Sequence, residues 1–328
     1  MDASRNQAQA TRLLPLAERV LTQYPFEVRE LTHLATHSNV LYRVVTSKGE
    51  QFVLRVGTPH ANSRSNLEIE VAWLDAIANE TRLEVVSPVR TREGVLIVDS
   101  FDEEIDKERS CVLFTWVPGQ PLGEGSGSFG YRLLGAMSAS LQAHGRDWDP
   151  PEGATMRIWD QVFYYEPEMD PVILHTPEYG HLFDMRRLGV IERALDLART
   201  VIGESYRTAR PQVVHGDLHE WNVHVAGSRL HAFDFEDVMV ALPAQDAAIS
   251  LYKSRTSDMR NEIHDAFRRG FESIAEWPII DERQLDGFHA ARQVMLMNYA
   301  ARVLPKDDAS DYIDQVMPWL DRCVARYR

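Results

Sequence analysis

The 328-residue chain contains little cysteine, no excess of basic residues and no long apolar run, and each scarcity excludes a class of protein. Its two cysteines, Cys111 and Cys323, provide neither a disulfide framework nor the spacing of a metal site, so a reducing compartment is the simpler expectation. Lysine and arginine total 35 against 49 acidic residues, a formal net charge of −14. Binding to nucleic acid or to an anionic membrane requires a concentrated basic surface, so we expect neither partner.

The lack of a long apolar run also argues against a membrane protein. No stretch approaches the length of a membrane span, and the first residues lack the continuous apolar core of a signal peptide. Hydrophobic residues make up 44% of the chain and charged residues 26%, which is typical of a globular protein. The length suffices for one large domain or for two lobes with separate cores. We therefore expect a soluble, cytoplasmic protein.

The most distinctive stretch is Val-Val-His-Gly-Asp-Leu-His-Glu-Trp-Asn-Val at residues 213–223. Asp217 and Asn222 have the D-x-x-x-x-N spacing of a kinase catalytic loop, in which the carboxylate faces an incoming hydroxyl and the amide oxygen reaches a metal on the nucleotide phosphates. A predicted hairpin after Asn222 would return Asp234 to its side. Magnesium takes one or two protein carboxylates together with phosphate oxygens. We therefore predict Asp217 as the catalytic residue and Asn222 and Asp234 as magnesium ligands.

Two motifs, His-Gly-Asp-Leu-His-x-x-Asn at residues 215–222 and Phe-Asp-Phe-Glu-Asp at residues 233–237, resemble those of the aminoglycoside phosphotransferase and choline kinase superfamily. These are kinase-fold enzymes that mostly act on small molecules. The resemblance implies an α+β, protein-kinase-like fold of two lobes. Residues 1–117 would form a mixed-sheet, nucleotide-binding lobe, and residues 118–328 a mostly helical, catalytic and substrate-binding lobe. It also implies ATP and Mg²⁺ as cofactors.

The N-terminal part has the pattern of a helix followed by a sheet. Residues 10–23 have helical spacing, and a second helix is predicted at residues 66–78. The acidic connection at residues 102–106 is expected to be exposed. Strand-like pieces lie at residues 26–34, 40–46, 51–56, 95–98 and 111–116.

Four residues in this part are candidates for contacts to nucleotide phosphates or for supporting them. Ser38 and Asn39 lie in a glycine-free turn where protein kinases carry a glycine-rich phosphate loop, and an ordinary polar turn is an equal alternative. Arg55 takes the place of the phosphate-binding lysine, and it keeps the charge and offers phosphate a bidentate fork. The family pattern Glu-x-x-Trp-Leu begins at Glu70, which makes Glu70 the expected partner of Arg55, with Glu68 as second choice.

The segment Phe114–Gly119 resembles the hinge between kinase lobes. By position alone, backbone groups of Thr115 and Val117 are expected to bond adenine, with Phe114 beside them. Asp246 matches a family aspartate that steadies the catalytic loop. Helices are predicted at residues 131–144, 185–207, 257–276, 283–303 and 309–327.

Residues 147–184 contain nine acidic residues and one base, Arg157, with aromatic residues interleaved. Carboxylates attract a cation and aromatic rings can face it, so this segment predicts a positively charged acceptor. A solvated acidic surface is an equally supported reading. The candidate acceptor contacts are Trp159, Asp160, Tyr164 and Glu166.

The function best predicted is ATP-dependent phosphorylation of a hydroxyl group on a small molecule. One alternative is a bacterial stress-response-type protein Ser/Thr kinase, which shares the His-Gly-Asp loop. Another is a non-catalytic, kinase-like binding module, because Arg55 replaces the lysine. That alternative predicts loss of the base or of a metal ligand, but Asp217, Asn222 and Asp234 are all present.

Overall fold

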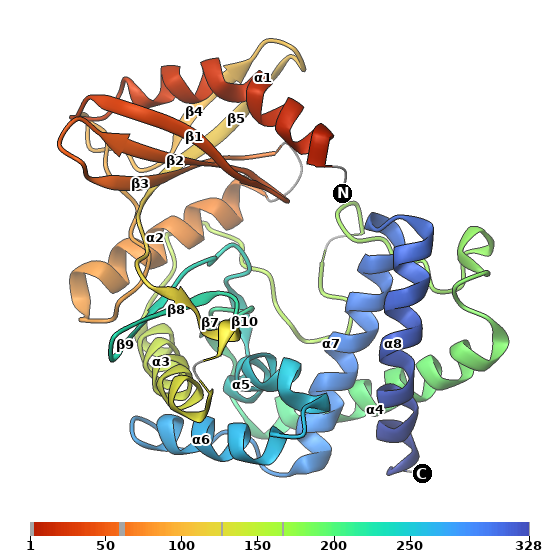
Figure 1. Ribbon diagram of the computed structural model, residues 1–328. Coiled ribbons are helices and arrows are strands. Elements are labelled where there is room, and N and C mark those ends of the chain that lie inside the picture. Colours follow the sequence, from red (N-terminus) through yellow and green to blue (C-terminus); the bar gives the residue numbers. More distant parts are fainter. Residues whose placement is uncertain (1–2, 59–62, 126, 166, 328) are drawn as a thin grey trace. The chain divides into compact units, whose positions relative to one another are not determined.

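The computed structural model describes residues 3–58, 63–125, 127–165 and 167–327, which form two compact units (Figure 1). The first unit is built on an antiparallel sheet and the second is mostly helical, which confirms the predicted α+β division. The sequence places every residue after 117 in the second lobe, whereas two later segments belong to the first unit. The first unit comprises Met1–Gln120, Asp149–Met156 and Ala226–Glu236, and the second comprises Pro121–Trp148, Arg157–Val225 and Asp237–Arg328.

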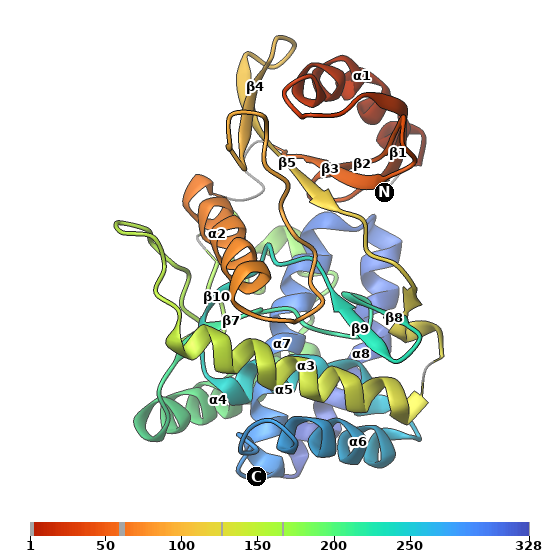
Figure 2. The ribbon, with the colours of Figure 1, turned by 90° about the vertical axis from the view of Figure 1, so that its left-hand side faces the viewer.

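Five antiparallel strands form the sheet of the first unit, in the order β1-β2-β3-β5-β4. Their bounds are Val28–Thr36 for β1, Val40–Thr46 for β2, Gln51–Val56 for β3, Val98–Asp102 for β4 and Lys107–Thr115 for β5. Val40 and Tyr42 of β2 are both buried, because side chains two residues apart point to the same face. Helix α1 (Ala3–Leu21) lies across the sheet in both views (Figures 1 and 2), and its Leu13 and Ala17 join the same core. Helix α1 begins well before the predicted start.

The connection between β4 and β5 is shorter than predicted, because β4 continues to Asp102 and β5 already begins at Lys107. Asp102, expected to be exposed, is buried. Its carboxylate accepts a hydrogen bond from Arg109 Nε at 2.6 Å and from Arg12 at 3.0 Å. Two guanidinium groups therefore compensate the buried charge, and the pKa of Asp102 lies below its ordinary value although burial alone would raise it.

A stretch at residues 84–89 ties the sheet to a segment from much later in the chain. The N–H of Val86 donates to the carbonyl oxygen of Ala232 at 2.8 Å, at the end of β9 (Arg229–Ala232). The N–H of Val89 donates to Leu113 of β5 at 2.7 Å. Strand β9 is thereby attached to the first unit, and so is the chain that directly follows it.

In its described residues the second unit is built mainly of six α-helices, with short strands and 3-10 turns between them. Its helices are α3 (Gly127–Asp147), α4 (Met185–Thr208), α5 (Pro243–Tyr252), α6 (Arg260–Glu272), α7 (Glu282–Val303) and α8 (Lys306–Ala325). All five predicted helices are present, with ends shifted by a few residues. Among the described residues, none of the helices combines the length and apolar character needed to cross a bilayer. The remaining short elements are η1 (Leu122–Glu124), η2 (Pro177–Tyr179), η3 (Lys253–Thr256), β6 (Gln120–Pro121), β7 (Gln212–Val214), β8 (Val223–Ala226) and β10 (Met239–Ala241).

Helices α3 and α6 lie alongside each other (Figures 1 and 2) and approach so closely that each has a glycine at the contact. A Cβ on Gly135 of α3 would lie 1.9 Å from the carbonyl oxygen of Phe267. A Cβ on Gly270 of α6 would lie 1.9 Å from the carbonyl oxygen of Arg132. Neither backbone oxygen can move aside without shifting its helix, so both positions require glycine.

We predict that Gly135→Ala lowers the melting temperature by several degrees, because inserting a methyl into a packed contact costs about 1–3 kcal/mol. Gly203→Ala is the matched control. Gly203 lies in α4 and is exposed, and a Cβ at this position would have no atom within 4 Å, so the higher helix propensity of alanine should leave stability unchanged or raise it. Thermal unfolding of both variants decides. Equal melting temperatures for Gly135→Ala and the unsubstituted protein would contradict the packing argument.

Candidate active site

Two short strands position the His-Gly-Asp stretch. Strands β7 and β10 pair in antiparallel register, so residues that follow β7 lie beside residues that precede β10. Gly216 therefore lies against Asp237, and a Cβ on Gly216 would be 2.1 Å from the carbonyl oxygen of Asp237. The φ angle of Gly216 is 82°, in the left-handed region that favours glycine. Both constraints require glycine directly before Asp217.

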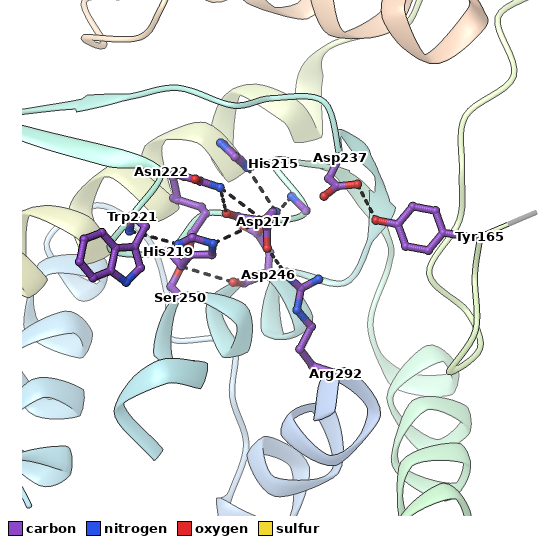
Figure 3. Close-up of polar contacts among 12 residues, drawn as sticks. Tyr165, His215, Asp217, His219, Trp221, Asn222, Asp237, Asp246, Ser250 and Arg292 are labelled. Carbon is purple, nitrogen blue, oxygen red and sulfur yellow. Dashed lines mark hydrogen bonds and ion pairs between the residues drawn. The ribbon is translucent and has the colours of Figure 1, made fainter. Parts of the chain in front are cut away.

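Asp217, the predicted catalytic residue, has donors at both carboxylate oxygens (Figure 3). Oδ1 accepts a hydrogen bond from Arg292 of α7. Oδ2 accepts one from Asn222 Nδ2 at 3.3 Å and lies 3.4 Å from His219 Nε2. Burial alone would raise the pKa of Asp217, but the charge of Arg292 and the contacts with His219 outweigh it and hold the pKa well below its usual range. Asp217 is therefore ionised at neutral pH.

Backbone contacts orient the two residues that flank Asp217 in Figure 3. The N–H of Trp221 donates to Nδ1 of His219 at 3.1 Å, so the ring hydrogen lies on Nε2, the atom that faces Asp217. The Nδ2 of Asn222 also donates to the backbone oxygen of Asp217 at 2.9 Å. Because the amide nitrogen is used on Asp217, the amide oxygen is the acceptor end that Asn222 can offer to a cation.

Asp246 supports the loop from α5, as predicted. Its Oδ1 accepts the N–H of Gly216 at 3.0 Å, and its Oδ2 accepts Nε2 of Gln142 at 3.0 Å. The side chain is fully buried, and burial raises the pKa of Asp246 to about 6 while the two donors oppose the rise. Asp246 thus accepts the backbone N–H of the residue directly before Asp217, which lies beyond the β7–β10 pairing.

A second carboxylate of the second unit, Asp237, was not singled out from the sequence. Its Oδ1 accepts a hydrogen bond from the hydroxyl of Tyr165 at 2.6 Å (Figure 3). The same oxygen lies 3.4 Å from a terminal nitrogen of Arg157. Backbone hydrogen bonds of Arg157 and Trp159 with Val240 attach this segment to β10 and bring Arg157 to Asp237. Burial, followed by the charge of Asp217, raises the pKa of Asp237. The available signal was Arg157, the single base in an acidic segment.

Arg292 was also missed. It lies in α7, where residues on every side of the helix are buried, and it is 9% exposed. Charged side chains are almost never buried unless they are paired. An arginine that directly follows Ala290 and Ala291 and lies just before the apolar run at residues 294–297 was therefore a signal of a buried partner, although the sequence could not name Asp217 as that partner.

In the first unit, Arg55 and Glu70 pair as predicted. Arg55 donates from both terminal nitrogens to the two carboxylate oxygens of Glu70, at 2.8 and 2.6 Å. Glu68, the second choice, pairs with Arg64 instead. Burial alone would lower the pKa of Arg55, but the charge and hydrogen bonds of Glu70 raise it, with smaller contributions from Glu236 and Asp234. A contact of Arg55 with nucleotide phosphates stays a prediction.

The side chains of Ser38 and Asn39 are bound to a carboxylate of the same unit. Ser38 Oγ and Asn39 Nδ2 donate to the two oxygens of Glu236, at 2.9 and 2.7 Å. Glu236 lies within the Phe-Asp-Phe-Glu-Asp motif, but no role for it followed from the sequence. Phosphate contacts by Ser38 and Asn39 stay a prediction, and their side chains would have to exchange Glu236 for the phosphate.

The hinge candidates Phe114, Thr115 and Val117 differ in whether they remain available to contact adenine. The N–H of Thr115 donates to the carbonyl oxygen of Ser87 at 2.9 Å, so this donor is not free for adenine. Phe114 is buried, and the guanidinium of Arg55 lies 5.0 Å from its ring centre. Phe114 therefore packs against the guanidinium of Arg55. Val117 is half-buried after the end of β5, and its contact with adenine stays a prediction.

Asp234 belongs to the first unit and has a φ angle of 65°, uncommon for a residue other than glycine. The next residue, Phe235, is buried against Trp73 of α2 (Arg64–Glu80), with ring centres 5.6 Å apart. Asp234 itself is exposed. Such local backbone strain is typical of functional sites.

The predicted magnesium pair, Asn222 and Asp234, lies in different units, and its assembly stays a prediction. Within the described parts of the chain, no group of three or more His, Cys, Asp or Glu side chains could hold a metal by itself. A magnesium ion carried by a nucleotide needs only one or two protein ligands, because phosphate oxygens and water supply the rest. One amide oxygen and one carboxylate fit that requirement.

The acidic segment corrects part of the acceptor prediction. The Trp159 ring is 1% exposed and packs on Tyr164 with ring centres 5.3 Å apart, so it is a core residue and cannot present a face to a cation. Asp160 is exposed, and Glu166 lies outside the described residues. Asp170 is buried in a pair with Arg302. The acids of this segment that the structure describes are therefore largely solvated or used for packing.

A sheet lobe with a buried Arg–Glu pair, and a helical lobe with an ionised Asp and an Asn at kinase spacing, define a phosphotransferase. The sequence model of the phosphotransferase enzyme family (APH) matches residues 30–288, and the chain belongs to this family. An uncharacterized protein of Synechocystis sp. is 27% identical over 248 residues, which is 74% of this chain. The matched region spans 65% of that protein.

Solved structures share the fold over nearly the whole chain. The microcompartment-associated aminopropanol kinase superposes with a TM-score of 0.79 at 23% identity, covering 96% of this chain and 97% of its own. Amicoumacin kinase, solved with AMP-PNP and Ca²⁺, has a TM-score of 0.75 at 17% identity and 96% coverage of both chains. Spectinomycin phosphotransferase, solved with ADP and spectinomycin, has a TM-score of 0.68 at 13% identity, covering 95% of this chain and 98% of its own. The kinase-like fold is thereby confirmed.

For Arg55 we predict that structural and nucleotide roles can be separated. Arg55→Ala should cost about 3–5 kcal/mol, because it leaves the buried carboxylate of Glu70 unpaired. The double variant Arg55→Met with Glu70→Leu should regain most of that stability, but its affinity for nucleotide should stay below that of the unsubstituted protein. Arg268→Ala, which breaks an exposed pair with Glu272, is the control and should cost at most about 1 kcal/mol. Unchanged nucleotide affinity of the double variant, measured by titration, would remove Arg55 from phosphate binding.

For Asp246 we predict different effects of two substitutions. Asp246→Ala leaves the buried N–H of Gly216 without an acceptor, at about 1–3 kcal/mol, and should expose this amide to hydrogen exchange, whereas Gln142 keeps Ser138 and Pro243 as acceptors. Asp246→Asn keeps an oxygen for Gly216, so its effect should be much smaller. Thermal unfolding and exchange of the Gly216 amide provide the measurement. Similar losses in both variants would show that charge, and not hydrogen bonding, is what the loop needs.

Proposed function

We propose that this protein transfers the γ-phosphoryl group of ATP to a hydroxyl group of a small molecule. The observation that carries the proposal is Asp217, ionised and held at both oxygens, at the position of the kinase catalytic residue in a chain of the phosphotransferase family. General-base catalysis needs a group that can accept the hydroxyl proton at short range. Asp217 would orient the acceptor hydroxyl and take its proton as the new oxygen–phosphorus bond forms.

ATP would supply the phosphoryl group, and Mg²⁺ would neutralise charge on its phosphates. Arg55, held by Glu70, would contact the phosphates, while the Asn222 oxygen and the Asp234 carboxylate would bind the metal. Support comes from the donor chemistry of these residues and from the nucleotides present in the amicoumacin kinase and spectinomycin phosphotransferase structures. The sequence prediction of a positively charged acceptor enters here as a part of the proposal that the assay tests.

The deciding experiment is ATP consumption measured against hydroxylated metabolites, hydroxy acids, amino alcohols, aminoglycosides and a generic protein substrate. Turnover with one class of small molecule supports the proposal. Turnover with the protein substrate alone would favour the protein-kinase alternative. Nucleotide binding without phosphorylation of any acceptor would favour the binding-module alternative.

With an active acceptor in hand, we predict that Asp217→Asn lowers turnover about 10²–10⁴-fold and leaves nucleotide affinity unchanged, because an amide cannot accept the proton. Asp311→Asn, at an exposed acid of α8 in the same unit, is the control and should retain full turnover. Thermal unfolding reports whether the loss of the charge opposite Arg292 unfolds the protein. Turnover of Asp217→Asn close to that of the unsubstituted enzyme would remove Asp217 from the mechanism.

A further inference from the structure

The side chain that meets Asp217 most closely is Arg292, and the proposed reaction does not by itself account for it. Arg292 donates to Oδ1 of Asp217, while Oδ2 is already held by Asn222 and His219 (Figure 3). Oδ1 is thus the oxygen that an acceptor hydroxyl would need. The loop does not depend on Arg292, because Asp246 holds Gly216 independently.

A buried guanidinium cannot simply leave its partner. Arg292 is 9% exposed, and a charge out of contact with water needs an opposite charge beside it. For a hydroxyl to reach Oδ1 of Asp217, Arg292 must exchange that oxygen for another anion. The molecule that brings the hydroxyl is the natural carrier of such an anion, because both must arrive together.

One buried donor in the surroundings of Arg292 has no acceptor. Besides Asp217, the groups that act on the charge of Arg292 are the phenols of Tyr164 and Tyr165 and the carboxylate of Asp237. The hydroxyl of Tyr165 is bound to Asp237. The hydroxyl of Tyr164 is buried and has no hydrogen-bond partner. A buried polar group of this kind calls for an explanation, and an absent ligand is one.

We propose that Arg292 selects the acceptor by binding a carboxylate on it, with Tyr164 donating a further hydrogen bond to the same group. The carboxylate replaces Asp217 as the ion-pair partner of Arg292. Oδ1 of Asp217 then accepts a hydrogen bond from the hydroxyl of the substrate. A planar guanidinium and a carboxylate match in geometry and charge. The acceptor is therefore a small hydroxy acid. An amino group elsewhere on it would also meet the charge predicted from the sequence.

This inference rests on the proposed function, and the test is arranged to separate the two. Each hydroxy acid of the panel is assayed beside its own amide, which keeps the hydroxyl and lacks the negative charge. The unsubstituted enzyme should prefer the acid by on the order of 10²-fold or more in kcat/KM, because the amide leaves Arg292 without a partner. Equal use of acid and amide would overturn the inference and leave the phosphotransferase proposal intact.

Substitutions show which residues cause the preference for the acid over its amide. Arg292→Gln should raise KM for the acid but not for the amide, which then no longer leaves a buried charge unpaired, and Arg292→Lys should lie between. Tyr164→Phe should raise KM for the acid roughly 10-fold, whereas a purely structural tyrosine with an unpaired hydroxyl would predict no loss. Arg302→Gln is the matched control, since Arg302 lies on the same helix in a buried pair with Asp170. It should keep the preference for the acid.

One outcome would assign Arg292 a different role, and another would refute the proposed function itself. A fall in kcat of Arg292→Gln that is equal for acid and amide, with the preference intact, would mean that Arg292 acts on the transferred phosphoryl group, and the inference would be wrong. If no acceptor is phosphorylated at all, the proposed function fails. Calorimetric titration of the hydroxy acids against the unsubstituted protein and Arg292→Gln then still decides, because binding that is absent or insensitive to the substitution overturns the inference.

Discussion

The pairing of β7 with β10 is the constraint on which the rest of the candidate site depends. It sets the chain after Val214 beside the chain before Met239, and only glycine at position 216 allows the two backbones to approach so closely. The amide of Gly216 is then turned to Asp246, and the carboxylate of Asp217 is turned to the charges around it. A three-residue strand is weak alone, so burial of the loop and the hydrogen bonds of Asp246 must maintain this geometry.

Charge compensation determines what Asp217 can do. Asp217 and Asp237 repel each other, and the charge of one raises the pKa of the other. Arg292 and Arg157 each pair with one of the two carboxylates, so the four groups together carry no net charge. A general base must be ionised before the reaction and available during it. The arginine that keeps Asp217 ionised also covers it, and an acceptor that engages the arginine resolves this conflict.

Contacts between residues close together in the sequence could be predicted from it, whereas contacts between residues far apart could be predicted only in part. The spacing of Asp217 and Asn222 follows from a short loop, and the Arg55–Glu70 pair follows from a strand and the next helix. Glu236 meets Ser38 across 198 positions, and Arg292 meets Asp217 across 75. No periodicity encodes such meetings, because each depends on tertiary packing within its own unit, around the sheet in the first and around α7 in the second. The predicted contact of Trp159 with a cationic acceptor does not fit the structure, because tertiary packing buries this ring although its segment is acidic.

The ion pairs of two arginines on helix α7 differ in what they hold in place. It contributes two arginines to buried pairs, Arg292 with Asp217 and Arg302 with Asp170. Removing ions from water costs several kcal/mol each, so a buried pair is weak evidence of stabilisation, and apolar residues of similar size often serve as well. Arg302 has a structural use, because with Asn298 it fastens the segment around Asp170 to the helix. Arg292 fastens nothing that Asp246 and Asn222 do not already hold, so its desolvation cost is best explained by the molecule that Asp217 is to receive.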